Sequence, residues 1–277
     1  MKDNLLIMLK GFVLGIANII PGVSGGTLAI TLGIYEKLIE TISHFKSKIK
    51  ENFKFLLFLV LGVGISLLVC SNIVSFCLDK YPFATILLFI GIIIGGVPKL
   101  LKKVKNTFNI SNLIIFLITF ALVMLMTFLS VKDNSVSLES LNAIKIIILF
   151  FSGFIASASM LLPGISGSFV LMLIGFYEPI INSIKDLTRF NNLTHNIIIL
   201  TSMGIGIIVG IIVAAKVIEW LLKKYEVKTY YGILGFVIAS IISIFITALS
   251  YSVGIIQVMV GVILLIIGIM ISRVIGD

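Results

Sequence analysis

Long apolar runs separated by short polar turns form the main pattern of this chain. Residues 5–20 are apolar up to a Pro-Gly turn, and residues 27–35 are apolar after it. Neither arm reaches the about 20 residues that a helix needs to cross a bilayer. The lengths therefore predict a hairpin that enters the membrane and returns, which is tolerated only where protein or a wet cavity surrounds its turn.

The rest of the chain contains apolar runs long enough to cross and a second broken segment. Residues 143–162 and 169–181 flank a second Pro-Gly turn, and the first of these arms is long enough to cross alone. That length argues against a hairpin in the second half. The predicted crossing helices cover residues 53–78, 83–97, 113–131, 197–215, 232–249 and 253–271.

The second broken segment repeats the first. Between Gly11–Glu36 and Gly153–Glu178, nine of the 26 positions are identical without a gap. They include the Pro-Gly and Ser-Gly of the turn and a later Tyr-Glu, which an apolar composition alone does not explain. Such matches indicate two copies of one structural unit. We therefore expect a single polytopic membrane domain over residues 1–277, with repeat one at 5–131 and repeat two at 143–272.

Composition and charge agree with a membrane protein. Hydrophobic residues make up 59% of the chain and charged residues 12%, which excludes a soluble core with a wettable surface. The net charge of +9 would also suit a nucleic-acid-binding protein. However, the lysines lie in short loops beside apolar runs, where anionic lipid headgroups are the expected partners and nucleic acid is not. The two cysteines have no metal-ligand or disulfide spacing.

The distribution of Lys and Arg selects a topology. If both broken segments are re-entrant, 16 of the 21 basic residues lie on one side of the membrane, whereas if both cross fully the split is 10 to 11. Cytoplasmic loops carry an excess of Lys and Arg. The sequence therefore predicts an all-α integral membrane protein with six crossings and both termini in the cytoplasm. It has two inverted-topology repeats, each a re-entrant broken-helix hairpin plus three transmembrane helices.

The two turns are the candidate binding site, because broken helices at mid-membrane in inverted-repeat transporters direct their N-termini at an anion. Glycine allows positive φ and close approach of main-chain N–H groups, and the hydroxyls cap the outgoing helix or donate to an oxyanion. Pro-Gly and Ser-Gly also suit any tight turn, so a purely structural role stays open. The candidate substrate-binding residues are Asn18, Pro21, Gly22, Ser24, Gly25, Gly26, Thr27, Pro163, Gly164, Ser166, Gly167 and Ser168.

Glu36 and Glu178 follow a Gly-x-Tyr motif at the far end of each hairpin. A carboxylate that faces a cavity can bind a proton or a sodium ion and couple it to transport. The alternative is an interfacial glutamate beside a tyrosine of the aromatic belt. We expect no catalytic residue, no metal site and no cofactor other than such a coupling ion.

The first signature, from Gly11-Phe12 through Pro21-Gly22-Val23-Ser24-Gly25-Gly26-Thr27 to Tyr35-Glu36, resembles that of the PopT polyprenyl-phosphate transporter family. The second signature, from Pro163 to Ser168 and then Gly175 to Glu178, is similar to the family's second one. The resemblance covers essentially the whole chain. It implies a flippase that returns undecaprenyl phosphate, the lipid carrier of bacterial cell-wall synthesis, across the cytoplasmic membrane.

Two other functions stay open at this point. A membrane polyprenyl-(di)phosphate phosphatase also uses opposed hairpins, but it needs a general acid or nucleophile and usually arginine clamps. This chain has only Arg189 and Arg273, and no histidine near either turn. A transporter of a small soluble anion on the same turns is the second alternative. The oligomeric state does not follow from the sequence.

Overall fold

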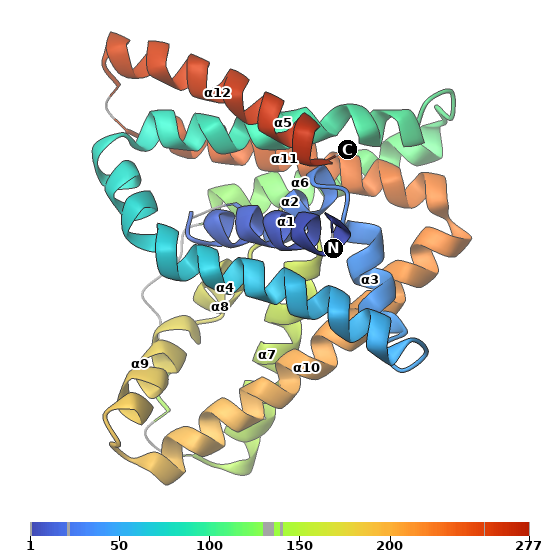
Figure 1. Cartoon of the computed structure of the whole chain (residues 1–277). Coiled ribbons are helices and arrows are strands. Elements are labelled where there is room, and N and C mark those ends of the chain that lie inside the picture. Colours follow the sequence, from blue (N-terminus) through green and yellow to red (C-terminus); the bar gives the residue numbers. More distant parts are fainter. Residues whose placement is uncertain (1, 21–22, 130–135, 139–140, 252, 277) are drawn as a thin grey trace.

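Helices are the regular secondary structure in the part of the chain that the structure describes. The structure is a computed structural model, and it describes residues 2–20, 23–129, 136–138, 141–251 and 253–276. These residues form twelve α-helices and no strand (Figure 1), which confirms the all-α prediction. The first six are α1 (Lys2–Asn18), α2 (Gly25–Thr31), α3 (Tyr35–Ser43), α4 (Ile49–Lys80), α5 (Pro82–Lys103) and α6 (Ile110–Phe128). The last six are α7 (Ala143–Leu161), α8 (Gly167–Leu173), α9 (Tyr177–Thr188), α10 (Leu193–Lys224), α11 (Glu226–Leu249) and α12 (Ile255–Gly276).

The helices of the first half recur in the same order in the second half. Helices α4 and α10 are each 32 residues long, and α1 packs along α4 as α7 packs along α10. Glycines let these backbones meet: a Cβ on Gly11 would lie 2.2 Å from the carbonyl oxygen of Leu59, and one on Gly153 would lie 2.4 Å from that of Met203. The recurrence supports an internal repeat, whereas inversion of the second copy stays a prediction.

The two halves share one core. Helix α12 of the second half packs along α5 of the first, and α11 packs along α6. Helix α2 contacts α5 and lies near the centre of the molecule behind α1 (Figure 1). Leu28 and Leu32 near α2 and Ile93 of α5 have no exposed surface. The halves are therefore interlocked and not two separable bodies.

Seven helices in the described residues are long and apolar enough to cross a membrane: α4, α5, α6, α7, α10, α11 and α12. The sequence predicted six crossings, and the additional candidate is α7, the first arm of the second broken segment. Most of these helices also continue beyond the apolar runs predicted for them, with α5 reaching Lys103 and α10 reaching Lys224. Long lysine side chains at helix ends can reach water while their stems stay on the apolar surface.

The prediction that residues 169–181 form one apolar arm is wrong, because α8 ends at Leu173 and α9 starts at Tyr177, bent by 108° from it. Gly175 has φ +76°, and the N–H of Phe176 donates to the carbonyl oxygen of Leu171 at 2.9 Å. This is a Schellman cap, which glycine permits at its left-handed position. Gly33, with φ +68°, ends α2 in the same way. The Gly-x-Tyr-Glu motif therefore ends one short helix and starts the next.

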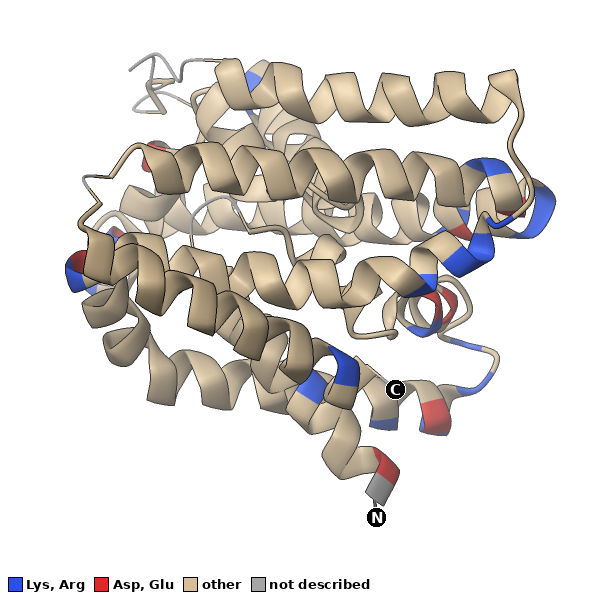
Figure 2. Cartoon of the chain, turned by 90° about the horizontal axis from the view of Figure 1, so that it is seen from above, with Lys and Arg blue, Asp and Glu red and all other residues tan. Residues whose placement is uncertain are grey.

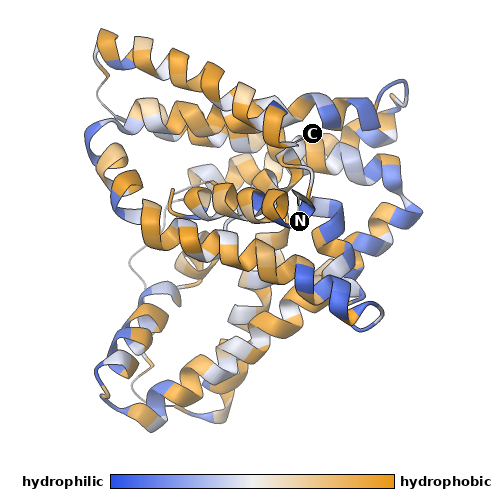
Figure 3. Ribbon diagram, in the orientation of Figure 1, coloured by the Kyte–Doolittle hydropathy of each residue, from blue (hydrophilic) through white to orange (hydrophobic). Residues whose placement is uncertain are grey.

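Charged residues gather at the helix ends, and the long helices carry apolar side chains between them (Figure 3). Lysines and arginines concentrate at one end of the helix array (Figure 2). Many large apolar side chains on the long helices are exposed, such as Leu68 at 84% and Ile255 at 79%. Such apolar exposure on a chain with seven candidate spans is that of a multi-pass membrane protein.

Candidate functional site

The second turn requires glycine at its tip. Helix α7 ends at Leu161, and α8 starts at Gly167 after an extended Ser166. Between them Gly164 has φ +78°, and a Cβ there would lie 2.9 Å from the carbonyl oxygen of Phe236. Both the left-handed backbone and the close approach of α11 exclude larger residues. In the first turn, Pro21 and Gly22 lie outside the described residues.

The two turns contact each other through side-chain to main-chain hydrogen bonds. Ser24 Oγ donates to the carbonyl oxygen of Ile165 at 3.2 Å, and the main-chain N–H of Gly164 donates to Thr27 Oγ1 at 2.7 Å. Tyr35 also donates its hydroxyl to the carbonyl oxygen of Leu161 at 3.0 Å. We call these three bonds the turn clasp. It joins segments that lie more than 120 residues apart in the chain.

The hydroxyls of Ser24 and Thr27 are hydrogen-bonded within the turn clasp and do not face a cavity. Their exposed fractions are 1% and 0%, and their oxygens are directed at the main chain of the second turn. Gly26 allows this approach, since a Cβ there would lie 3.2 Å from three carbonyl oxygens at the end of α7. Tyr35 is likewise buried, and its hydroxyl is held by the bond to Leu161. The first copy thus provides a brace for the second.

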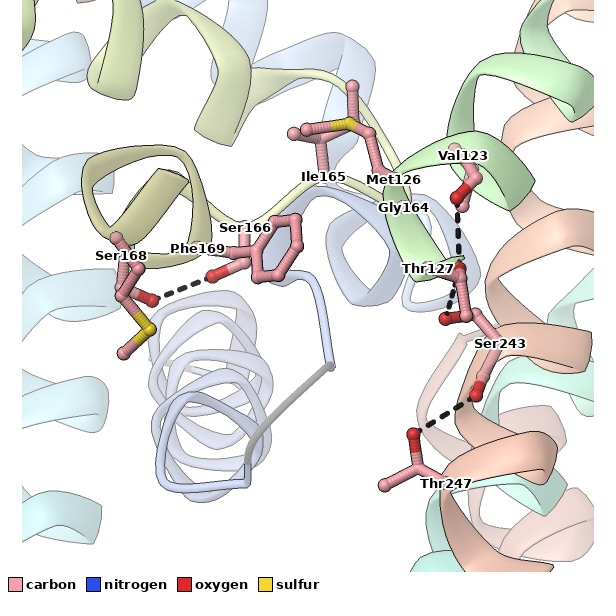
Figure 4. Close-up of a pocket in the computed structure, with 11 residues that line it drawn as sticks. Val123, Met126, Thr127, Gly164, Ile165, Ser166, Ser168, Phe169, Ser243 and Thr247 are labelled. Carbon is pink, nitrogen blue, oxygen red and sulfur yellow. Dashed lines mark hydrogen bonds between the residues drawn. The ribbon is translucent and has the colours of Figure 1, made fainter. Parts of the chain in front are cut away.

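The hydroxyls of the second copy face a cavity. Ser166 and Ser168, 2.8 Å apart at their Oγ atoms, line a space of about 280 Å³ between the second turn, α6 and α11. On its other side, Thr127 Oγ1 of α6 donates to Ser243 Oγ of α11 at 2.8 Å, and Thr247 Oγ1 lies one helical turn further on (Figure 4). We call this space the hydroxyl cavity. It is lined by five neutral hydroxyls, of which those of Thr127 and Thr247 donate to their own helices or to Ser243, and it has no charge among its described lining residues.

Sequence reasoning missed Thr127, Ser243 and Thr247. Ser243 and Thr247 are four residues apart and so share a face of α11, and each lies in a run of apolar residues. Polar side chains inside membrane helices are costly and face the protein interior or a cavity. The spacing of Ser243 and Thr247 was the signal in the sequence that could have indicated a polar face on α11. The position of Thr127 beside them depends on the packing of α11 on α6.

The remaining predicted binding residues lie near the turns but outside the lining of the hydroxyl cavity. Asn18 is exposed at the end of α1, and its Oδ1 would lie 3.3 Å from a Cβ on Gly25. Gly167 permits contact of α8 with α7, because a Cβ there would lie 2.6 Å from the carbonyl oxygen of Ala156. Pro163 is buried beneath the turn clasp. These residues shape the turns and do not line the hydroxyl cavity.

Glu36 and Glu178 have different surroundings. Glu36 accepts a hydrogen bond from the Tyr230 hydroxyl, lies 3.3 Å from Lys103 Nζ, and lines a polar cavity of about 500 Å³ that also includes Lys99. Glu178 is exposed and has no hydrogen bond or ion pair with any residue in the described part of the chain. The described residues contain no cluster of His, Cys, Asp and Glu that could hold a metal ion.

Comparison with known proteins identifies a family and two named relatives. The family model described as VCA0040-like, undecaprenyl phosphate translocase-like, matches residues 14–257. A protein of Staphylococcus aureus named polyprenyl-phosphate transporter is 33% identical over 242 residues, covering 86% of this chain and 85% of that protein. A Vibrio cholerae protein of the same name is 29% identical over 247 residues, covering 84% of this chain and 75% of its own.

No solved structure is significantly similar to the chain. The family match nevertheless spans both turns, the hydroxyl cavity and most of the helices that build them. The chain therefore belongs to the undecaprenyl phosphate translocase-like family of polyprenyl-phosphate transporters.

Proposed function

We propose that this protein is a flippase that carries undecaprenyl phosphate across the bacterial cytoplasmic membrane and so returns the carrier lipid for reuse. The printed names of its relatives supply the substrate class. The observation that carries the proposal is the hydroxyl cavity, a group of polar side chains between apolar helices beside the turn clasp. A phosphate headgroup cannot enter hydrocarbon without such partners.

The hydroxyl cavity suits transient binding of a phosphate. Ser166, Ser168, Thr127, Ser243 and Thr247 supply hydroxyls that would exchange their present neutral hydrogen bonds for bonds to the phosphate. Hydrogen bonds to a charged oxygen are about twice as strong as neutral ones. Neutral donors leave no uncompensated charge in the membrane when the phosphate departs. The prenyl chain stays in contact with lipid. We therefore assign the headgroup to the second turn, with the first turn as its support.

Movement of the headgroup past this point requires the turn clasp to open. Because α5 packs along α12 and α11 packs along α6, a whole half cannot rock as one rigid body. We propose that the pairs α1–α4 and α7–α10, which carry the two turns, move relative to a core of α5, α6, α11 and α12. Alternating access then arises from relative movement of the two broken segments.

The topology belongs to the same proposal. We place the lysine-rich ends of the helices and both termini in the cytoplasm, where they contact anionic lipid headgroups. The two broken segments are re-entrant hairpins from opposite faces, related as inverted repeats. Of the two candidate coupling glutamates we favour Glu36, because it lies in a cavity with Lys103 and Tyr230. The coupling ion is a proton or sodium.

Reconstitution into liposomes tests the function. Undecaprenyl phosphate in the outer leaflet is measured with a leaflet-specific label, with and without a proton or sodium gradient. We expect protein-dependent loss of label from the outer leaflet and no release of inorganic phosphate. Hydrolysis of the phosphate would contradict the proposal and favour a phosphatase. Equal inhibition by inorganic phosphate and by polyprenyl phosphate would favour a transporter of small anions.

A further inference from the structure

An apolar groove reaches the second turn from the side opposite the hydroxyl cavity. It has a volume of about 400 Å³ and lies between α6, α10 and α11. Its body is formed by apolar side chains: Ile115, Ile218, Leu221, Ile233 and Phe236. We call it the chain groove. Its inner end is Pro163, next to Gly164 and Ile165 of the hydroxyl cavity, so one turn separates the two spaces.

Helix α11 runs past both spaces. Its residues from Lys228 to Phe236 line the chain groove, and Ser243 and Thr247 line the hydroxyl cavity. Lys228 and Phe236 are eight residues apart, about 12 Å along a helix. The groove therefore extends from the lysine-rich end of α11 to the middle of the molecule. Tyr35 of the turn clasp also borders it.

The outer end of the chain groove is positively charged and aromatic. Lys228 Nζ lies 5.8 Å from the centroid of the Tyr225 ring, and Lys224 Nζ lies 5.5 Å from the same ring. Tyr225 packs edge-on against Trp220, with ring centroids 5.6 Å apart. Aromatic side chains of this kind sit at the level of lipid headgroups. An ammonium over a ring keeps N–H donors for an oxyanion.

We propose that the chain groove holds the first isoprene units of a polyprenyl phosphate, with the phosphate on Lys228, at the opposite end of the transport path from the hydroxyl cavity. This inference rests on the proposed function. The charge of Lys228 complements the phosphate, and the apolar body complements the chain. A single groove receives one chain, which fits a polyprenyl phosphate better than a phospholipid with two acyl chains.

Gly232 offers a way to fill the chain groove. A Cβ at Gly232 would lie 3.4 Å from Ile115 Cγ2, an ordinary contact, so G232L places the rest of its side chain in the groove. G204L on α10 is the matched control, since a Cβ there meets no atom within 4 Å. With geranylgeranyl phosphate as the probe, we expect about tenfold weaker binding in G232L, because apolar contact with the chain is lost. G204L should bind as the wild type does.

Charge is tested separately with K228Q, for which we expect binding about threefold to tenfold weaker and less dependent on salt. If G232L and K228Q each bind as the wild type does, while the wild-type protein transports the lipid, the proposal for the chain groove is wrong and the proposed function stands. Competition by phosphatidylglycerol equal to that by undecaprenyl phosphate would also overturn it, because the occupant would then be a membrane phospholipid. A wild-type protein that neither binds nor transports polyprenyl phosphate would instead refute the proposed function.

A second measurement does not depend on the folding of a variant. Geranylgeranyl phosphate with a diazirine on its chain is photoactivated with the wild-type protein in nanodiscs, and the labelled residues are mapped by mass spectrometry. We expect labels on Ile218, Leu221 or Phe236, competed by undecaprenyl phosphate. Labels confined to the lipid-facing sides of α4 and α12 would overturn the chain groove.

Discussion

The two copies of the turn have closely similar sequences and different surroundings. In the first copy Ser24 and Thr27 are buried and bonded to the main chain of the second turn. In the second copy Ser166 and Ser168 face a cavity and bond to each other. The chain contains two turns of one kind, but where they meet, only the hydroxyls of the second turn are left facing a cavity. The comparison favours the proposal that the first copy is a support and the second copy binds the headgroup.

The largest expected effect is on the fold of the second turn. G164A forces an alanine into a left-handed conformation, at a cost of about 1–2 kcal/mol, and brings its Cβ against the Phe236 carbonyl. We expect a clear fall in the thermal unfolding temperature in detergent and loss of transport. G204A, whose Cβ would meet no neighbouring atom, is the control. An unfolding temperature for G164A equal to that of G204A would contradict the geometry of the turn.

The supporting role of the first copy predicts a loss of stability in T27V. Valine has nearly the shape of threonine but leaves the partly buried N–H of Gly164 without its acceptor, at a cost of about 1–3 kcal/mol. Thermal unfolding of T27V should therefore occur at lower temperature, whereas S168A should unfold as the wild type does. Equal stability of T27V and wild type would show that the turn clasp does not hold the two copies together.

The binding role of the second copy predicts a loss of transport without a loss of stability. The double variant S166A/S168A removes two donors from the hydroxyl cavity, and we expect about tenfold weaker apparent affinity for undecaprenyl phosphate, or about 1.4 kcal/mol. S202A, which removes a hydroxyl that bonds to its own helix on α10, is the control. Normal affinity in the double variant would remove the second turn from the binding site.

The smallest expected effect distinguishes the two glutamates. E36Q removes the proposed coupling carboxylate and weakens a partly exposed contact with Lys103, which is worth less than about 1 kcal/mol. We therefore expect about a threefold fall in transport rate, with no remaining dependence on the ion gradient. E178Q should be unchanged, because Glu178 has no polar partner in the described part of the chain. Transport rates under a proton or sodium gradient provide the measurement. Equal effects of E36Q and E178Q would contradict the claim that the two glutamates have different roles.

Sequence reasoning found the elements of the fold and the two turns that meet at the candidate site. Apolar runs and paired turns predict helices, a repeat and the two Ser-Gly segments, because these properties are local. The break at Gly175 was missed, since one glycine in an apolar run does not reveal its left-handed conformation. Thr127 was missed because only packing of α11 on α6 places it beside Ser243. The unequal roles of Ser24 and Ser166 likewise depend on contact between distant segments.

Reversible cross-linking of the turns tests the central claim most directly. In a background without Cys70 and Cys77, cysteines replace Ser24 and Ile165, because Ser24 Oγ lies 3.2 Å from the main-chain carbonyl oxygen of Ile165. Transport of undecaprenyl phosphate is then measured in proteoliposomes after oxidation and again after reduction. We predict that the disulfide forms on oxidation and stops transport, and that transport returns when the disulfide is reduced. Failure to form the bond, or full transport by the cross-linked protein, would contradict the claim that these turns meet and must separate.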